Sequence, residues 1–427
     1  MSLSRRQALG GGLALAGGGL LVRAIQQGVI ELDGSPGLKA WDDWNRGRHS
    51  GPLALVAAGL LAASPHNTQP WRFAVNRLGV DLFEAPERQL GAMDPFGRER
   101  MAGLGAAIHN MALASTRLGR LATVRLLPDP DSVRHVARIE LDSESGARPV
   151  PHPLLGAIGR RHTHRGRWTG APITEAERTA LLDFPRPPDI GITLIDSDSQ
   201  TGQRFAALTN EATAAITEDM EMMAASHRWF RHDRAEINRR KDGLTMATSG
   251  APAWLAAAAM LGPRPDMATE ARFWLEATRD THLPSASLYG VIHAPNTLAR
   301  RQALLVGGAW QRVHLIATEL GLAAQPLNQL PEMIDRDLQL GRPGRFAQAA
   351  TALLPPGSPR PALAFRLGRA DAPAGPSLRR PVSQVMGGPA RLGYEVSRAE
   401  AETAVREAQL QRRLNGGANG GSGGDKP

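Results

Sequence analysis

Two short polar segments of this 427-residue sequence have the residue types needed to bind a charged or heteroaromatic ligand. The first reads Arg-Arg-His-Thr-His-Arg over residues 160–165. Guanidinium groups form bidentate, charge-assisted hydrogen bonds with phosphate, and the Thr163 hydroxyl adds a donor. By composition alone, such a run is more often a solvated surface loop. His162 and His164 could also ligate a metal, but no third ligand follows at a recognisable spacing, so we expect no metal centre.

The second segment, Ser64-Pro-His-Asn-Thr-Gln-Pro-Trp71, places polar side chains between an apolar stretch and an alternating one. Its two prolines stiffen the loop, and the Asn67 and Gln69 amides can each donate and accept hydrogen bonds. Such amides suit the edge of a heteroaromatic ring with alternating acceptors and donors. The alternative is an ordinary helix-to-strand turn in which both amides bind backbone groups. The residues alone favour that alternative.

The composition limits the chemistry that these segments can serve. Hydrophobic residues make up 42% of the chain and charged residues 21%, as in an ordinary globular protein. The absence of cysteine excludes disulfides, thiolate metal sites, iron–sulfur clusters and a cysteine nucleophile. Redox chemistry would therefore need an organic cofactor or a His/carboxylate metal site. The net charge of +9 comes almost wholly from arginine, with no dense basic run carrying aromatics, so no nucleic-acid partner is expected.

Hydrophobic periodicity predicts the elements that must position the two segments. A helix over 53–63 leads into the second segment, and alternation from Trp71 predicts a hairpin turning at 76–79. Three prolines within 149–153 indicate a linker. The stretch 242–295 is rich in Ala, Pro and Gly and exceeds what a compact repeat needs, so we interpret it as a possible lid. The other expected elements are strands near 124–126, 137–141, 192–195 and 363–367, a long helical stretch over 209–240, and a helix ending at Gly321.

An internal similarity indicates two related halves. Residues 105–119 and 307–321 lie 202 positions apart, agree at six of fifteen positions, and each begin and end with glycine. Both read as amphipathic helices closed by a glycine cap. A shared amphipathic pattern is the simpler explanation, but the matching lengths and caps favour duplication. We therefore predict an α+β chain with a first half over 38–150 and a second half over 151–390.

The ends of the sequence read as additions to these halves. Arg5-Arg6 precede a weakly apolar, glycine-rich stretch, typical of a Tat export signal that we place over residues 1–30. A transmembrane helix would need about 20 strongly apolar residues. We expect export to the periplasm through the Tat machinery, with a membrane anchor if the signal stays uncleaved. Residues 391–427 are expected to form a polar helix and a flexible tail.

Together, the two polar segments resemble the FMN-binding motifs of the nitroreductase superfamily. Arg161-His-Thr-His-Arg165 is similar to the family's Arg-x-Ser/Thr-x-Arg/Lys phosphate motif, and Ser64 to Trp71 to its Ser-x-x-Asn-x-Gln-Pro-Trp loop. Ser377-Leu-Arg-Arg-Pro-Val382 resembles the C-terminal basic element. The two motifs lie in different halves, as in the fused, Tat-exported Acg-type branch. The resemblance implies a duplicated nitroreductase-like fold whose halves form an intramolecular pseudo-dimer, with one FMN site per monomeric chain.

The resemblance also implies a role for each matching residue. Arg161, Thr163, Arg379 and Arg380 would bind the phosphate, and Arg165 would reach the pyrimidine edge of the flavin ring. His162 would contribute mainly its backbone. From the other half, Ser64, Pro65 and Asn67 would pack on the ring, with Gln69 supporting their loop. Asn328 and Gln329 occupy the place of the family's Glu-Gly beside flavin N5, where Gln329 lacks glycine's room for close approach.

Two functions follow from the resemblance, and a third stays open. The first is an FMN-dependent oxidoreductase that takes hydride from NAD(P)H at flavin N5 and reduces a nitro, quinone or similar electron-poor acceptor, with no catalytic side chain of its own. The second is a flavin-sequestering protein in which a lid over 242–295 prevents turnover. The weakest is an FMN-free structural remnant. The fold alone does not choose among them.

Overall fold

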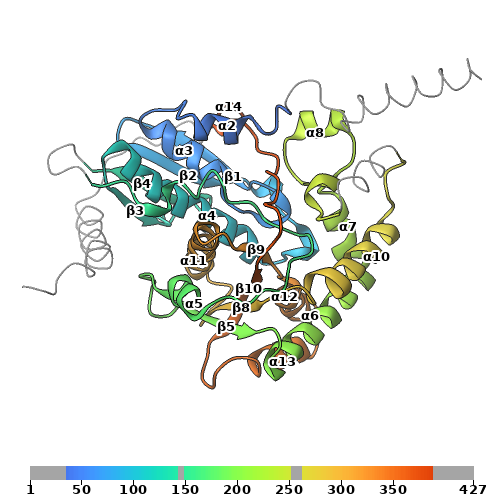
Figure 1. Ribbon diagram of the computed structural model, residues 1–427. Helices are drawn as coiled ribbons and strands as arrows, with labels where there is room; N and C mark the ends of the chain where they lie inside the picture. Colours follow the sequence, from blue (N-terminus) through green and yellow to red (C-terminus); the bar gives the residue numbers. More distant parts are fainter. Residues whose placement is uncertain (1–34, 143–148, 252–261, 388–427) are drawn as a thin grey trace, which may run out of the picture.

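The computed structural model describes residues 35–142, 149–251 and 262–387, which form two α+β halves around a central pair of helices (Figure 1). This arrangement confirms the predicted fold class. The predicted export signal over 1–30 and the predicted polar helix and tail over 391–427 lie outside the described residues.

The first half contains a four-stranded antiparallel sheet of order β1-β2-β4-β3. Its strands are β1 (Trp71–Val75), β2 (Gly79–Glu84), β3 (Ala122–Leu126) and β4 (His135–Leu141). β1 and β2 form the predicted hairpin, in which Asn76 Oδ1 accepts hydrogen bonds from the backbone N–H groups of Leu78 and Gly79. An Asn side chain that binds its own turn in this way favours the tight connection.

The second half repeats this topology. Its sheet has the order β5-β8-β10-β9, formed by β5 (Gly191–Asp196), β8 (Leu288–Ala294), β9 (Ala323–Pro326) and β10 (Arg360–Gly368). By position in the chain, the strand order is first, second, fourth, third in both sheets. One long helix follows the second strand in each half: α4 (Arg98–Ser115) and α11 (Arg300–Glu319). This shared topology is the one expected of a duplicated fold.

The remaining elements surround the sheets. The first half has α2 (Lys39–Asn45) and α3 (Pro52–Leu60) before β1. α5 (Glu175–Leu182) precedes β5 in the second half. The connections of the second half carry α6 (Gln200–Glu218), α7 (Met220–His227), β6 (Phe230–Arg231), α8 (Arg234–Arg240), β7 (Leu244–Thr245), α10 (Met267–Ala277), the π-helical turn η7 (Thr278–His282), α12 (Gln329–Gln339) and α13 (Arg345–Thr351), and α14 (Val382–Val385) follows β10.

The crossing of α4 and α11 joins the two halves at the centre of the molecule (Figure 1). A Cβ on Gly105 would overlap the backbone of Leu304, and a Cβ on Gly307 would overlap the backbone of Ala102. Each residue of one contact lies 202 positions from its counterpart in the other, which is the spacing of the internal similarity. The crossing is therefore a reciprocal contact about a pseudo-twofold axis, and it requires glycine on both helices.

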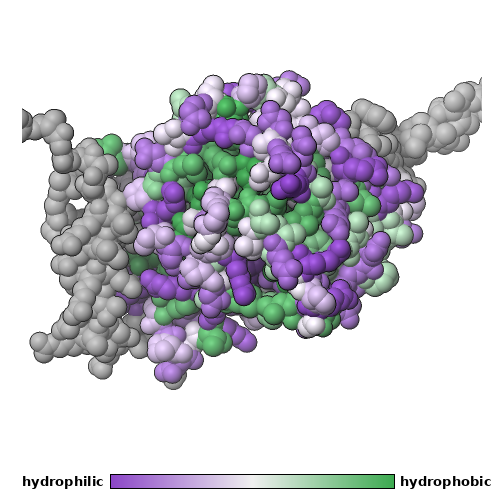
Figure 2. Space-filling view, turned by 90° about the horizontal axis from the view of Figure 1, so that it is seen from below, coloured by the Kyte–Doolittle hydropathy of each residue, from purple (hydrophilic) through white to green (hydrophobic). Residues whose placement is uncertain are grey.

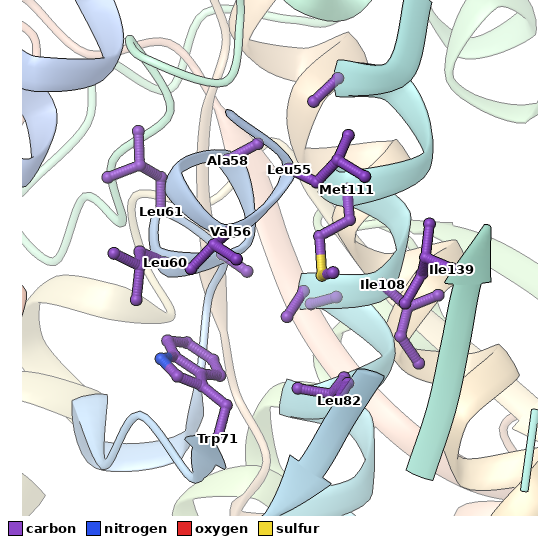
Figure 3. Close-up of a cluster of buried hydrophobic side chains, with 14 of the residues drawn as sticks. Leu55, Val56, Ala58, Leu60, Leu61, Trp71, Leu82, Ile108, Met111 and Ile139 are labelled. Atoms are coloured by element: carbon purple, nitrogen blue, oxygen red, sulfur yellow. The ribbon is translucent and has the colours of Figure 1, made fainter. Parts of the chain in front are cut away.

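The core of the first half lies between α3, α4 and the sheet. α3 is almost wholly apolar and buries Leu55, Val56 and Leu60. Figure 3 shows these side chains beside Met111 of α4 and above Trp71. Full burial of such side chains contributes about 1.5–3 kcal/mol each. The second half has its own clusters on both sides of its sheet.

Two sequence predictions about the second half are wrong in detail. The proposed lid over 242–295 includes β8, which is buried throughout and pairs with β5 and β10, so it is a central strand of the sheet. Its apolar run, Leu288 to Ala294, has no polar alternation because both faces are covered. The long helix over 209–240 ends at Glu218, where Asp219 instead caps α7, and it is interrupted again by β6.

A cluster of buried carboxyl groups lies where α4 meets α12. Glu99 of α4 and Glu332 of α12 are both buried, with Asp94 and Asp335 close by and Arg98 as the cation among them. Arg98 Nε donates to Asp335 at 2.6 Å. Burial and the neighbouring carboxylates raise the pKa of Glu99 to about 8 and hold that of Glu332 well above its usual range. The Arg98–Asp335 ion pair links α4 of the first half to α12 of the second.

The chain leaves the second half after β10 and returns to the first (Figure 1). Met386 forms a parallel bridge with Phe73 at the open edge of β1, and α14 packs near α3. Residues 377–380 lie along this return path, which we call the C-terminal strap (369–387). The face viewed in Figure 2 has apolar groups near its centre and polar groups around them. In the described ranges, no helix has the length and hydrophobicity needed to span a bilayer.

Candidate functional site

The loop 64–70 has an unusual backbone. His66, Asn67 and Gln69 all have positive φ, at 46°, 53° and 52°. Non-glycine residues rarely adopt this conformation, and each costs of order 1 kcal/mol unless the surroundings impose it. Three such residues within four positions indicate a loop that is held by its contacts.

Side-chain amides hold that loop to other parts of the chain. Asn67 Nδ2 donates to the backbone oxygens of Gly243 and Leu378 at 3.1 and 3.0 Å. Gln69 Nε2 donates to the oxygen of Lys241 at 2.8 Å, and its Oε1 accepts from the backbone N–H of Arg380 at 2.9 Å. The amides thus bind backbone groups, as the structural alternative from the sequence anticipated. Gln69 supports the loop, and the polar atoms of Asn67 are engaged within the protein.

Arg161 and Arg379 converge on the C-terminal end of α3. Arg161 Nη2 donates to the oxygen of Leu61 at 3.0 Å, and Arg379 Nη2 donates to that of Ala62, also at 3.0 Å. The carbonyl end of a helix carries partial negative charge and so favours cations. Arg379 also donates to Asn67 Oδ1 at 2.7 Å, which links the strap to the loop. The Nε atoms of both arginines are buried and have no hydrogen-bond partner.

Arg165 and Arg380 both lie near the loop 64–70. Arg380 Nη2 donates to the oxygen of Gln69 at 2.6 Å. Arg165 Nη1 donates to the oxygen of Thr248 at 3.1 Å. Burial, and then the Arg165 charge, lower the pKa of His66 to about 4, so this imidazole is neutral at pH 7. The phosphate-type motif of the second half and the loop of the first half are therefore neighbours.

Sequence reasoning missed two residues of this region. Arg366, in the middle of β10, is fully buried, stacks on Trp168 with its Cζ 3.7 Å from the ring centroid, and donates to the oxygen of Gly166 at 2.9 Å. His314 of α11 accepts from Arg161 at Nδ1 (3.3 Å) and donates from Nε2 to the oxygen of His162 (3.3 Å). A single arginine within the apolar run 363–367 was a signal for the first. A histidine on an amphipathic helix gave none.

The five arginines have no carboxylate partner. Within the described residues, no Asp or Glu oxygen lies within 4.0 Å of the guanidinium nitrogens of Arg161, Arg165, Arg366, Arg379 or Arg380. Burial lowers the pKa of Arg161 and Arg165 to about 10, that of Arg366 and Arg380 to about 9, and that of Arg379 well below its usual value. Asp242 and Glu87 act on Arg380 only from beyond ion-pair distance. Buried cations without an ion-pair partner are costly, so this cluster is suited to an anion.

The other predicted residues of the two motifs lie around this cluster. The His162 ring packs edge-on against Trp41, with 4.5 Å between centroids. The half-buried Thr163 hydroxyl has no hydrogen-bond partner among the described residues. Ser64 Oγ accepts from the backbone N–H of Gln69 at 3.0 Å, and Pro65 lies against Gly103 of α4. Thr163 is thus the motif side chain that is available to a ligand.

Asn328 and Gln329 lie apart from these contacts. Asn328 Oδ1 accepts from the backbone N–H of Ala364 at 3.0 Å, which fixes the start of α12 against β10. Gln329 is buried, and its Nε2 reaches Thr278 Oγ1 of η7 at 3.5 Å. Its Oε1 is buried without a partner. The structure links Gln329 to the arginine cluster only through η7, so a place beside a ligand stays a prediction.

Residues 241–250 cover both motifs. The backbone N–H of Gly243 donates to the oxygen of Asn67 at 3.1 Å. A Cβ on Gly250 would overlap the backbone of Arg165. Asp242 holds the segment through ion pairs with Arg88 and Arg231. This covering segment, 241–250, is the part of the predicted lid that the structure places over the motifs.

The arginine cluster forms no ion pair among the described residues and lies between two halves of like topology, an arrangement expected of a duplicated nitroreductase-like fold. In the described ranges, no three His, Asp or Glu side chains are placed to share a metal ion. Curated relatives support the same class. The chain is 37% identical over 124 residues to Putative NAD(P)H nitroreductase Rv3131 of Mycobacterium tuberculosis, and 34% identical over 136 residues to Putative NAD(P)H nitroreductase acg of the same species. The resemblance to the nitroreductase superfamily is thereby confirmed.

These matches are partial. They cover 28% and 32% of this chain, and the chain spans about a third of the length of the curated relatives, 34% and 36%. No family model matches. Among solved structures, the FMN-dependent nitroreductase NfnB from Mycobacterium smegmatis in complex with NADPH is 18% identical, covers 57% of this chain and 100% of its own, and has a TM-score of 0.32. A nitroreductase with bound FMN from Bacteroides fragilis is 14% identical, covers 58% and 100%, and has a TM-score of 0.30.

Proposed function

We propose that this chain binds FMN at the arginine cluster and is an oxidoreductase of the nitroreductase type. The observation that carries the proposal is the set of arginines from 161–165 and from the C-terminal strap, which lie around the loop 64–70 and form no ion pair with a carboxylate. A flavin phosphate supplies the missing negative charge. The relatives named NAD(P)H nitroreductases support a nicotinamide as electron donor.

The residues divide between phosphate and ring. Arg161 and Arg379 would bind the phosphate, because they lie at the end of α3 and each has an unused donor. The free hydroxyl of Thr163, two residues after Arg161, would add a donor. Arg165, on the side of His66, would lie at the ring. Bound FMN supplies two-electron transfer to electron-poor acceptors such as nitro compounds or quinones. The chain's own part is to bind and orient the flavin and to exclude water from it.

Titration of the purified apoprotein with FMN tests this proposal. We expect one FMN per chain. Arg161→Gln should weaken binding by about 2–3 kcal/mol, roughly 30- to 150-fold, because a buried charged partner of the phosphate is lost. Arg345→Gln is the control, since Arg345 pairs with Glu211 at the surface. Two FMN per chain, no binding, or equal effects of both variants would reject the site.

A second function, flavin sequestration, has its own support. The covering segment 241–250 is fixed to Asn67, Gln69 and Arg165 by hydrogen bonds and close backbone packing. Its backbone thus occupies the approach to the ring side of the proposed site. Hydride transfer needs the nicotinamide within about 3–3.5 Å of the flavin. A segment held in this place would slow reduction by NADPH while small reductants still reach the flavin.

Stopped-flow bleaching of the FMN-loaded chain separates these two functions. Sequestration predicts slow bleaching by NADPH and rapid bleaching by dithionite. Asp242→Asn removes the ion pairs to Arg88 and Arg231 at nearly constant shape, so it should speed the NADPH reaction specifically. The surface variant Arg345→Gln should change neither rate. Rapid NADPH bleaching of the unaltered chain would favour the reductase.

We further propose that the protein is exported in folded form through the Tat machinery and acts as a monomer in the periplasm. The twin arginines at positions 5 and 6 support export, and the pairing of both halves within one chain supports the monomer. Changing both arginines to lysine should retain the protein in the cytoplasm. Unchanged periplasmic localisation, measured by fractionation, would contradict Tat dependence.

A further inference from the structure

The pseudo-twofold axis relates the loop 64–70 to a second loop. The first lies between α3 and β1, and the loop 183–190 occupies the corresponding place between α5 and β5. On α11, Gln311 contacts the first loop through the backbone N–H of Ala63 at 3.4 Å. The residue 202 positions earlier is His109 of α4. The duplication therefore places a counterpart of the arginine site beside His109 and the loop 183–190.

This counterpart is also rich in cations. Arg312 of α11 lies over the Phe184 ring, with Cζ 5.5 Å from its centroid. Arg186 lies over the same ring at 5.4 Å. The linker places His152 close by, where its backbone N–H donates to Thr116 Oγ1 of the segment after α4. The Arg312 charge acts on both His109 and His152, and Arg186 shares the Phe184 ring with Arg312.

The donors of this group are largely unused. The Arg312 guanidinium has no hydrogen-bond acceptor and no ion pair within the described residues, and its Nε is buried. His109 Nε2 is likewise buried without a partner. Arg186 donates to the backbone oxygen of Leu182 at 2.8 Å and has no carboxylate partner in the same ranges. Buried donors without partners cost free energy that a bound acceptor would recover.

We propose that Arg312, His109, His152 and Arg186 form a second site that binds a small tetrahedral oxyanion, such as phosphate or sulfate. Arg312, His109 and His152 each keep part of their surface exposed, although Arg312 Nε and His109 Nε2 are themselves buried, so the anion would bind from the exposed side of these residues. The loop 183–190 contains no Asn or Gln, and the C-terminal strap passes the other loop. A flavin therefore lacks its contacts here, and the site takes the anion alone.

Binding at this site couples to protonation. Burial, then the Arg312 charge, lower the pKa of His109 to about 3 and that of His152 to about 4, so both imidazoles are neutral in the free protein at pH 7. An anion beside His109 favours its protonated form, which raises its pKa. His152 Nδ1 accepts from the backbone N–H of Leu154 at 3.1 Å, so His152 would bind the anion through Nε2 as a neutral donor. Anion affinity then rises as pH falls. The other titratable groups nearby are Asp183 and Asp189 of the loop, which form no ion pair with these arginines, and His293, whose pKa is lowered by burial and then by Arg186.

Isothermal titration with sodium sulfate tests the site, because sulfate keeps the same charge between pH 5 and 8. The full chain is titrated with and without saturating FMN, which separates this site from the arginine cluster. We expect one sulfate per chain that FMN does not displace and that binds more tightly at pH 5 than at pH 7. Arg312→Gln should weaken this sulfate at least tenfold, while Arg312→Lys should keep part of the affinity.

Two controls give the result its meaning. Arg161→Gln alters the arginine cluster and should leave the FMN-insensitive sulfate unchanged, and the surface variant Arg345→Gln should do the same. His109→Gln should reduce the pH dependence and is the second test if Arg312→Gln does not fold. Sulfate binding that FMN abolishes, or that survives in both the Arg312→Gln and His109→Gln chains, would overturn the proposal. Its failure would leave FMN binding at the arginine cluster untouched, since FMN is titrated separately.

Discussion

Gly307 lies at the crossing of α4 and α11, and replacing it should lower the stability of the protein. Gly308, the next residue of α11, provides the control. Gly307→Ala adds a Cβ that would overlap the backbone of Ala102, and a backbone atom cannot rotate away. Gly308→Ala adds the same group one residue later, where the nearest atom, Gly105 O, is at 3.8 Å. Both substitutions make the same chemical change in one helix, so their difference isolates the crossing.

The magnitude has two parts of opposite sign. Alanine in a helix interior is more favourable than glycine by about 1 kcal/mol. Forcing an extra carbon into a packed interface typically costs 1–3 kcal/mol, and here the helices must separate as units. Gly308→Ala should therefore be neutral or stabilising by up to about 1 kcal/mol. Gly307→Ala should lower the free energy of unfolding by up to about 2 kcal/mol after its propensity gain, which places it about 1–3 kcal/mol below Gly308→Ala.

Urea unfolding followed by circular dichroism measures the difference. We expect the midpoint of Gly307→Ala to fall and that of Gly308→Ala to stay or rise, with equal slopes. Gly105→Ala should behave like Gly307→Ala, because it occupies the pseudo-symmetric position against Leu304. Equal midpoints for Gly307→Ala and Gly308→Ala would refute the reciprocal close contact.

Three further predictions concern single polar side chains. In the FMN-loaded chain, Arg165→Gln should lower the flavin reduction potential by roughly 20–50 mV, because a cation at the ring favours the anionic reduced form; spectroelectrochemistry measures it, and an unchanged potential would contradict the ring assignment. The pKa of Glu99 is raised to about 8 in the folded chain. The contribution of its protonated form to the free energy of unfolding is therefore complete below the unfolded pKa near 4.5 and is lost as pH rises through 8. The loss is at most about 1.4 kcal/mol per pH unit. Glu99→Gln should therefore flatten the fall of stability between pH 5 and 8, seen in urea midpoints, and an unaltered slope would show that the carboxyl is already ionised. Thr163→Val should weaken FMN by about 1 kcal/mol, the net value of one hydrogen bond, whereas Thr169→Val, at an exposed turn, should not; equal affinities in a fluorescence titration would remove Thr163 from the site.

Much of the first half could be predicted from its sequence, because its signals are local. The alternation from Trp71 and the turn at Asn76 specify the β1–β2 hairpin, and the repeat at 105–119 marks α4. The repeat also indicated the two halves. The repeat did not predict that α4 and α11 cross, because the close approach at Gly105 depends on residues about 200 positions away.

The elements of the second half were harder to predict because its sequence patterns fit more than one structure. β8 is buried on both faces, so its run from Leu288 to Ala294 lacks the alternation that identifies a strand, and it lay inside a stretch rich in Ala, Pro and Gly. Asp219 follows polar residues that are helical, so the sequence does not mark it as a helix end. In the structure its carboxylate caps α7 and separates this helix from α6. Local pattern does not separate such cases.

The candidate site shows the same limit. The motif residues Arg161, Arg165, Arg379 and Arg380 were named from their order in the sequence, and the structure brings them to one loop. Arg366 was not predicted because one polar residue in an apolar strand does not show which residues it contacts. The engagement of Asn67 by Gly243 and Leu378 depends on tertiary contacts that no local pattern encodes.

The C-terminal strap also sets when the site can exist. Arg379 and the loop residue Asn67 that it binds are separated by 312 positions in the chain. During synthesis the first half emerges and begins to fold long before the strap is made. Until then the open edge of β1 has no Met386 beside it, and the carbonyl end of α3 lacks Arg379. A nascent chain without the strap therefore has no complete arginine cluster. A ligand of that cluster can bind only after residues 369–387 have been translated and folded. Ligand binding thus distinguishes chains that contain the strap from chains that end before it.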